Sequence, residues 1–136
     1  PPPGKGGGGE GDQEFREVQF LYAGSQRLND VGDLPLCTNC EFAWLPSNLL
    51  TIISPLWPLH ALRLLDLHDN VIQYLPDERF WGALGSLQIL FLHNNRIGKT
   101  AAYAGLGGSP VLRCLTLHGN PVAEAPLYRA LTVAMV

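Results

Sequence analysis

The chain has 136 residues, a formal net charge of −3 and 46% hydrophobic residues, which suits one domain with its own core. It contains no run of Lys or Arg, so its charge pattern argues against a nucleic-acid partner. No apolar stretch approaches the roughly 20 residues that a membrane-spanning helix needs, so we expect no membrane segment.

The N-terminal residues 1–13 are rich in proline and glycine and begin Pro-Pro-Pro-Gly-Lys-Gly-Gly-Gly-Gly. A segment of this composition cannot bury a hydrophobic core, so we expect a flexible leader there. We expect the remaining residues, 14–136, to form one folded domain.

A short phrase occurs three times along the chain and ends at Asn70, Asn95 and Asn120, which are 25 residues apart. The three copies read Leu-Leu-Asp-Leu-His-Asp-Asn, Ile-Leu-Phe-Leu-His-Asn-Asn and Cys-Leu-Thr-Leu-His-Gly-Asn. They match L-x-x-L-x-L-x-x-N, the signature of a leucine-rich repeat. One strand per repeat cannot bury its own apolar face, so the repeats must stack. We predict an α/β leucine-rich-repeat solenoid with a parallel concave sheet and with helices and loops on the convex side.

Two weaker copies precede these three. Counting back 22 residues from Asn70 gives Asn48, with Cys40 and Ala43 in core positions, and a further 22 residues gives Gln26. The sequence therefore predicts about five repeats. We interpret the terminal amides as structural, because an amide can both donate and accept hydrogen bonds at a turn whose buried backbone groups need partners.

Between the third and fourth repeats, residues 75–84 have the pattern of a short convex helix. Asp77 is the predicted N-cap, and Phe80, Trp81 and Leu84 would share the inward face. The corresponding segment of the next repeat, residues 98–110, is rich in Gly and Ala and is expected to be a loop.

The three cysteines favour a reducing compartment. Cys40 occupies a core leucine position and is expected to pack as a small apolar side chain. Cys37-x-x-Cys40 has no second Cys or His pair nearby to complete a zinc site. The chain also lacks an Asn-x-Ser/Thr glycosylation acceptor, so we expect an intracellular protein.

Nothing in the pattern of polar residues predicts catalysis. The acidic residues are scattered, and no Ser or Cys has a base and an orienting group in a recognisable constellation. We therefore expect no enzymatic activity, no catalytic residues and no cofactor.

The residues between the leucines of each strand should face the concave side, because side chains alternate across a strand. Stacking places them in columns: Phe20, Phe42, Leu64, Ile89 and Cys114; then Tyr22, Trp44, Asp66, Phe91 and Thr116; then Gly24, Pro46, His68, His93 and His118. An exposed apolar face of this kind usually marks a contact site. We predict as partner-binding residues Tyr22, Phe42, Trp44, Asp66, His68, Phe91 and His93.

The column His68, His93 and His118 permits a second interpretation. Three imidazoles on neighbouring strands could in principle ligate a metal or respond to pH. Parallel stacking, however, points their ring nitrogens in one direction rather than toward a common centre. We therefore expect no metal site and keep a metal-binding protein as the less favoured hypothesis.

The 22-residue spacing, with Asn48-Leu-Leu-Thr-Ile-Ile, resembles an intracellular subclass of leucine-rich-repeat proteins. That subclass includes the nuclear regulator of protein phosphatase 1, the splicing protein U2 A-prime and the outer-arm dynein leucine-rich light chain. The stretch from Asn120-Pro-Val to Leu127-Tyr-Arg129 looks like the C-terminal cap of this subclass. Because the chain stops at Val136, we expect this cap, from about residue 120, to be incomplete.

A more specific resemblance lies in Leu75-Pro-Asp-Glu-Arg-Phe-Trp81, since the repeat consensus does not demand this segment. Together with the repeats beside it, it is similar to the leucine-rich repeat and IQ domain-containing protein 3 family. That resemblance implies ciliated or flagellated cells. It implies calmodulin binding only through IQ motifs outside this segment, which contains none.

From the residues and the resemblance together, we expect a non-enzymatic protein–protein interaction scaffold. The resemblance favours a structural component of the ciliary or flagellar axoneme, with axonemal or microtubule-associated partners. The alternative is a regulatory subunit that binds a protein phosphatase or another soluble intracellular partner.

Overall fold

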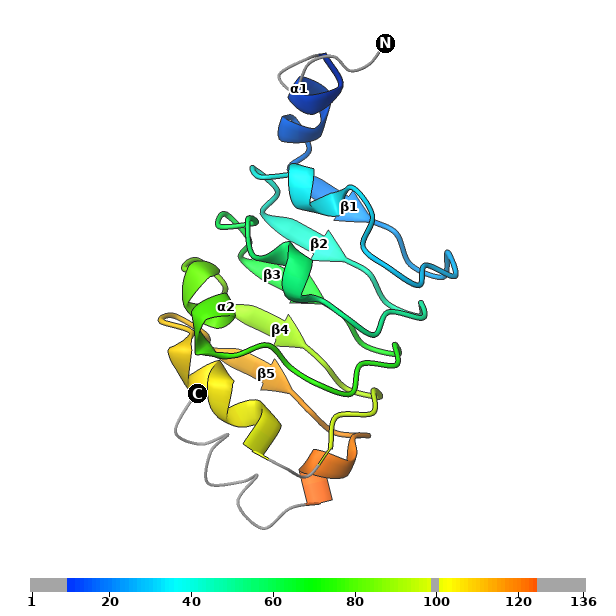
Figure 1. Cartoon of the computed structure of the whole chain (residues 1–136), viewed down its shortest axis with the longest axis vertical. Coiled ribbons are helices and arrows are strands. Elements are labelled where there is room, and N and C mark those ends of the chain that lie inside the picture. The colour runs from blue at the N-terminus through cyan, green and yellow to red at the C-terminus, as the bar shows by residue number, and fades with distance from the viewer. Residues whose placement is uncertain (1–9, 99–100, 125–136) are drawn as a thin grey trace.

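Five short strands form one open parallel sheet in the computed structural model, which describes residues 10–98 and 101–124 (Figure 1). The strands follow one another in chain order across the sheet: β1 (Phe20–Tyr22), β2 (Phe42–Trp44), β3 (Leu64–Asp66), β4 (Ile89–Phe91) and β5 (Cys114–Thr116). The predicted α/β solenoid of five repeats is confirmed. No helix of the described ranges is long and apolar enough to cross a membrane.

The strand register follows the predicted columns. Phe20 pairs with Phe42 and Tyr22 pairs with Trp44 between β1 and β2, and the same one-to-one pairing continues to β5. The residue between them in each strand points inward, from Ala43 through Leu65 to Leu90, and these three are almost fully buried. This inward and outward alternation follows from strand geometry. It leaves two side chains of every strand on the concave face.

The core is a stack of leucines from the consensus positions of consecutive repeats. Leu62, Leu87 and Leu112 precede the strands, and Leu67 and Leu92 follow them, all buried. Cys40 takes a leucine position and is 1% exposed, as predicted. Burial is the main reason that the pKa of its thiol rises to about 11, so this cysteine stays protonated and unreactive at neutral pH.

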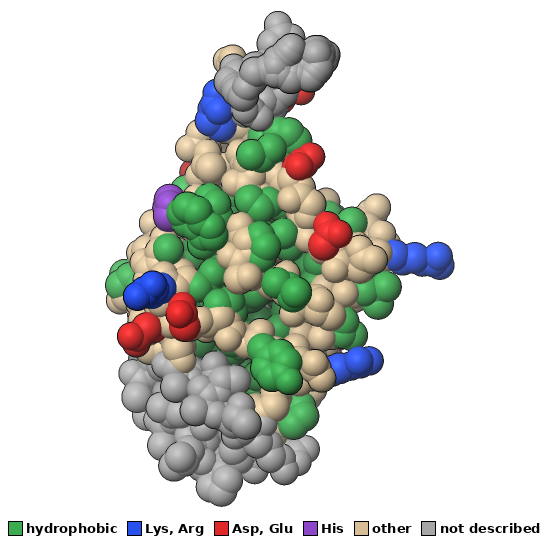
Figure 2. All heavy atoms as spheres, viewed as in Figure 1, with side chains coloured by type: hydrophobic (Ala, Val, Ile, Leu, Met, Phe, Trp, Pro, Cys, Tyr) green, Lys and Arg blue, Asp and Glu red, His purple; other side chains and the backbone are tan. Residues whose placement is uncertain are grey.

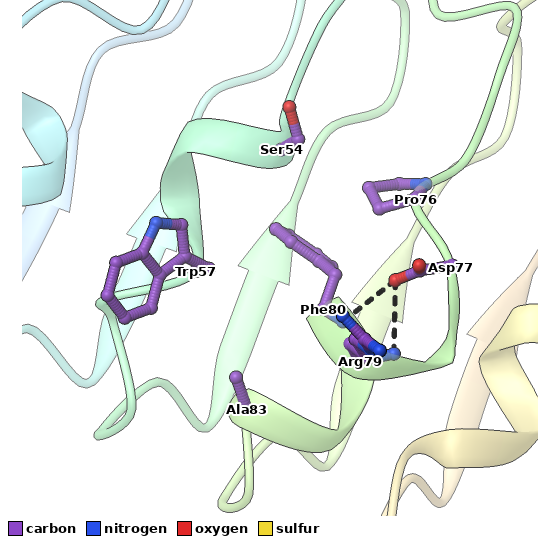
Figure 3. A pocket seen from close by; sticks show the side chains of 7 residues that line it. All are labelled: Ser54, Trp57, Pro76, Asp77, Arg79, Phe80 and Ala83. Carbon is purple, nitrogen blue, oxygen red and sulfur yellow. Dashed lines mark hydrogen bonds between the residues drawn. The ribbon is translucent and has the colours of Figure 1, made fainter.

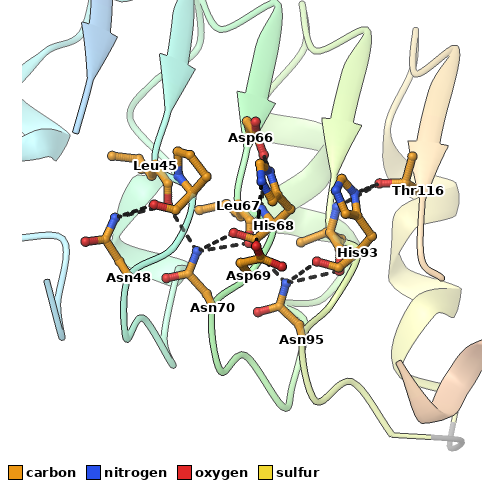
Figure 4. A network of polar contacts seen from close by, with 12 residues as sticks. Leu45, Asn48, Asp66, Leu67, His68, Asp69, Asn70, His93, Asn95 and Thr116 are labelled. Carbon is orange, nitrogen blue, oxygen red and sulfur yellow. Dashed lines mark hydrogen bonds and ion pairs between the residues drawn. The ribbon is translucent and has the colours of Figure 1, made fainter. Parts of the chain in front are cut away.

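Buried asparagines connect each turn to the one before it (Figure 4). The Asn70 side chain donates to the carbonyl oxygens of Leu45 and Leu67 at 3.0 Å, and its Oδ1 accepts from the backbone N–H of Leu50 at 3.0 Å. Asn48, Asn95 and Asn120 repeat this arrangement. In the first repeat the side chain of the exposed Gln26 donates within its own turn, to Gly24 O, while its backbone N–H donates to Asn48 Oδ1. The structural interpretation of the amides is confirmed for the four asparagines.

The convex side carries helices of different kinds. The predicted helix is α2 (Glu78–Ala83), and Asp77 caps it by accepting from the backbone N–H groups of Arg79 and Phe80. The other repeats use short 3₁₀ helices at Leu34–Leu36 (η2), Ser54–Leu56 (η3), Ala101–Gly108 (η4) and Pro121–Glu124 (η5).

The Gly- and Ala-rich segment at 98–110 was expected to be a loop, and this expectation was wrong. It forms the eight-residue helix η4, which packs against α2. A Cβ atom on Gly108 would lie 2.6 Å from Glu78 O, and one on Gly105 would lie 2.9 Å from Pro76 O. The glycines therefore allow close packing of two convex helices, which a composition-based prediction does not detect.

The structure describes part of the expected leader at the N-terminal end and little of the expected cap at the C-terminal end. Helix α1 (Glu10–Arg16) begins within the segment expected to be a leader, so regular structure starts before residue 14. Its residues after Gly11 favour a helix, and Phe15 packs against the core. Residues 1–9 and 125–136, which include most of the expected C-terminal cap, lie outside the described residues.

Candidate partner-binding surface

Four aromatic side chains form a continuous patch on the concave face of β1 and β2. We call Phe20, Tyr22, Phe42 and Trp44 the aromatic patch. The rings of Phe20 and Phe42 stack with centroids 5.3 Å apart, and Trp44 lies 6.1 Å from Phe42. Phe20 is 62% exposed and Tyr22 is 73% exposed. This much exposed aromatic area is uncommon on a surface that meets only water.

The parallel register produces this patch. Residues 22 positions apart occupy the same site in neighbouring repeats, and neighbouring strands lie about 4.8 Å apart, which is a good spacing for stacked rings. Arg63 lies at the start of the next repeat, and its guanidinium carbon is 5.6 Å from the centre of the Phe42 ring. Its Nη1 atom is 3.8 Å from Glu41 Oε1. The patch therefore has a charged border on its β3 side.

A second stacked column lies where the strands end. We call His68, His93 and His118 the histidine ladder. Neighbouring rings have centroids 4.5 Å apart and are inclined by only 9° and 14°. The edge of Phe91 approaches His93 at 6.0 Å, and His93 Nδ1 lies 2.7 Å from Thr116 Oγ1. Phe91 is half-buried, and it connects the histidine ladder to the concave residues of β4 through its contact with His93.

Asp66 differs from the other predicted contact residues because it is only 6% exposed. Its carboxylate accepts from the backbone N–H of His68 at 3.0 Å and contacts Nδ1 of the same residue (Figure 4). The side chain therefore orients the first rung of the histidine ladder, and little of it is left to meet a partner. The repeat spacing places Asp66 in the concave column. It cannot show that the Asp66 carboxylate is already bound by His68, two residues later.

Solved structures with the same architecture identify the fold. The chain superposes on a structure described as the Drosophila melanogaster SNF/U2A' complex with a TM-score of 0.73, at 22% sequence identity over 84% of this chain and 66% of that one. It superposes on an internalin from Listeria monocytogenes with a TM-score of 0.59, at 18% identity over 84% of this chain and 41% of that one. This chain has the leucine-rich-repeat fold. At these identities the likeness concerns the fold alone.

Curated relatives make the resemblance more specific. The leucine-rich-repeat chain is 32% identical over 76 residues to leucine-rich repeat and IQ domain-containing protein 3 of Mus musculus. It is 33% identical over 79 residues to the Homo sapiens protein of the same name. These matches cover 56% and 58% of the chain, but only 12% of each relative. No family model matches the chain.

The histidine ladder gives the leucine-rich-repeat domain a pH-dependent element. Burial lowers the pKa of His93 below its ordinary value of 6.5, with further lowering from His68 and His118 and opposition from Asp66 and Asp69. Below pH 6.5 the His93 imidazole is therefore protonated more readily in the unfolded chain than in the folded chain. The contribution to stability is complete above pH 6.5 and is lost as the pH falls through 6.5 toward the lowered pKa.

We expect the urea midpoint of the domain to fall between pH 7.5 and pH 5, and to fall less in a His93→Phe variant. Phenylalanine retains a flat ring for the stack but cannot be protonated. The difference between the two proteins in the fall of the urea midpoint therefore separates the effect of protonating His93 from that of protonating the carboxylates. An equal fall in both proteins would show that protonation of His93 does not contribute.

The ladder geometry also bears on the metal hypothesis. Among the residues that the structure describes, no three His, Cys, Asp or Glu side chains are grouped so as to hold a metal ion. Stacked parallel rings account for this, since their nitrogens do not converge on one point.

One feature of the opposite side was missed by the sequence reasoning. Trp57, in the Ser54-Pro-Leu-Trp-Pro58 segment, is 55% exposed on the convex side and borders a groove beside α2 (Figure 3). A tryptophan just after the buried Leu56, flanked by prolines, was the available signal. Such a segment turns tightly, so one apolar side chain enters the core and the next faces outward.

Proposed function

We propose that this leucine-rich-repeat domain is a non-enzymatic scaffold that docks a partner protein on its concave face. The observation that carries the proposal is the aromatic patch on a regular sheet, in which Phe20 and Tyr22 are exposed and Phe42 and Trp44 are half-buried beside them. The histidine ladder extends the same face toward β5. Burial of these rings by a partner would remove their apolar surface from water at little cost in side-chain entropy.

The chemistry of the face supports binding rather than catalysis. Tryptophan and tyrosine are the side chains that most often dominate interface energies, and Trp44 and Tyr22 both belong to the patch. The concave columns of the described strands bring aromatic, aliphatic and imidazole groups together. Their one carboxylate, Asp66, is already occupied by His68. An acid–base pair poised over an enclosed reaction site would require a different arrangement.

We further propose that the partner belongs to the axoneme of cilia or flagella. This part of the proposal rests on the resemblance to leucine-rich repeat and IQ domain-containing protein 3, with which the chain shares about a third of its residues over the matched segment. Cross-linking in ciliated cells, followed by mass spectrometry, tests it. Cross-links from residues 18–120 to axonemal or microtubule-associated proteins are the expected result. Enrichment of a soluble phosphatase instead would overturn the axonemal assignment but retain a partner-binding role.

The concave surface itself is tested with substitutions. We expect Trp44→Ala and Phe91→Ala together to weaken binding of the captured partner at least 30-fold, because one buried aromatic anchor contributes about 2 kcal/mol. The measurement is a titration of the purified partner with wild-type and variant protein.

The matched control is Tyr74→Ala, which removes an aromatic side chain that is 76% exposed outside the concave strands. It should leave the affinity within about twofold of wild type. Unchanged binding by the Trp44 and Phe91 variant, with both proteins folded, would place the partner on another surface.

A further inference from the structure

A groove on the convex side lies between η3 and α2, away from the aromatic patch (Figures 1 and 3). Its volume is about 480 Å³, and its lining residues come from two consecutive repeats: Ser54, Trp57, Pro76, Asp77, Arg79, Phe80 and Ala83. Hydrophobic side chains also gather on the face shown in Figure 2. The groove combines an apolar surface with a small set of polar groups, as ligand sites commonly do.

The apolar part of the groove has two aromatic walls. Trp57 stands on one side, 55% exposed, and Phe80 projects from α2 into the space between Trp57 and Pro76 (Figure 3). The methyl group of Ala83 closes one end. His60 lies beside Trp57, with ring centroids 6.0 Å apart and the two rings tilted by 60°.

Hydrogen-bond acceptors at the groove are largely engaged already. Asp77 Oδ1 accepts from the N–H groups of Arg79 and Phe80 at 3.1 Å and 3.3 Å. The carbonyl oxygen of Pro76 accepts from the Trp81 indole at 3.1 Å. The carbonyl oxygen of Ala83 lies 2.7 Å from His60 Nδ1, and since a carbonyl can only accept, the histidine donates.

Hydrogen-bond donors at the groove are available. Within the described part of the chain, neither the Trp57 indole N–H nor the Ser54 hydroxyl has a hydrogen-bond partner, and the Arg79 guanidinium has neither a hydrogen bond nor an ion pair. A well-matched ligand therefore brings acceptors and apolar surface and few donors of its own. Asp77 and Arg79 together leave the lining without a dominant charge, which favours a neutral ligand over an acidic one.

We propose that the groove between η3 and α2 binds a proline-rich segment of a partner protein. Proline has no backbone N–H, so a proline-rich chain offers carbonyl acceptors and ring surfaces and almost no donors. It adopts an extended polyproline II helix before binding, which limits the entropy lost on docking. Grooves lined by aromatic side chains recognise such segments in other folds. This site would act in addition to the concave face.

The test is a titration of ¹⁵N-labelled protein with a decaproline peptide, followed through the indole N–H signals. The chain has 3 tryptophans, so each signal reports a different place: Trp44 on the concave face, Trp57 in the groove and Trp81 in the core. We expect a saturable shift of the Trp57 signal and little change in the Trp44 signal; the Trp81 N–H donates to Pro76 O at the groove and is not used as a reference. A glycine–serine peptide of equal length should produce no saturable shift.

Two variants examine the role of the indole donor. Trp57→Phe keeps an aromatic ring but removes the N–H, and should weaken peptide binding about fivefold, the usual effect of losing one hydrogen bond. The remaining groove residues would be followed through backbone amide shifts. Trp44→Phe, the same change on the concave face, should leave peptide affinity unchanged.

Three results would overturn the proposal. One is the absence of saturable shifts at millimolar peptide, and another is equal affinity in wild type and Trp57→Phe. The third concerns the chain's own Pro-Pro-Pro sequence at residues 1–3. If the peptide binds only after residues 1–9 are deleted, the occupant is this chain's own segment rather than a partner.

Discussion

Replacing Asn95 by alanine is expected to lower the free energy of unfolding by about 3–5 kcal/mol, because several buried backbone groups lose their partners together. The Asn95 side chain donates to the carbonyl oxygens of Leu67 and Leu92 at 3.0 Å and accepts from the N–H of Ile72 at 3.0 Å. All three of these residues are fully buried. Each orphaned group would cost about 1–3 kcal/mol, with partial relief where water enters. Urea unfolding followed by circular dichroism measures the change.

The matched control is Asn39→Ala, since Asn39 is exposed and makes one side-chain hydrogen bond, to Arg16 O at 2.9 Å. Its cost should be about 1 kcal/mol or less. Asn95→Leu separates volume from hydrogen bonding, because leucine fills the site but satisfies none of the three groups. We expect it to be as destabilising as alanine. A loss below about 1 kcal/mol in both Asn95 variants would show that the amides do not hold the turns together.

The same buried amides explain why so much of the fold could be predicted. Asn70, Asn95 and Asn120 must fall at one point of each repeat, because each bonds the backbone of its own turn and of the preceding one. Their spacing in sequence therefore reports the stacking of the strands in space. Even Asn48, in a degenerate repeat, could be located by counting, and it makes the same bonds. Repetition turns a local constraint into a global one.

The remaining features depend on contacts that repetition does not encode. Asp66 is buried where its carboxylate contacts His68, and the equivalent positions of β4 and β5 hold Phe91 and Thr116 instead. Helix η4 depends on the fit of Gly105 and Gly108 against the backbone before and within α2. The groove at Trp57 arises where two unlike convex segments, η3 and α2, adjoin. Each feature is a departure from the consensus, so a consensus-based argument places the residues without showing what they contact.

Substituting Trp81 by alanine is expected to lower the free energy of unfolding by about 3–5 kcal/mol, the usual range for removing a large buried aromatic ring. Trp81 is fully buried on the inward face of α2. Its ring meets Phe80 edge to face at 4.8 Å, and its N–H donates to Pro76 O at 3.1 Å. Alanine would leave a cavity and an unpaired carbonyl, and the neighbouring backbone cannot easily close the gap because η4 packs tightly against α2.

Trp57→Ala is the matched control, because the same atoms are removed from a side chain that is 55% exposed. It should cost about 1 kcal/mol or less. Repeats of a solenoid contact mainly their neighbours, so the damage from Trp81→Ala should be concentrated beside α2. Hydrogen exchange should then rise most in residues 76–92 and least in β1. Equal costs for the two tryptophan variants would mean that Trp81 does not anchor α2, and that the wall of the convex groove is held in place by η4 alone.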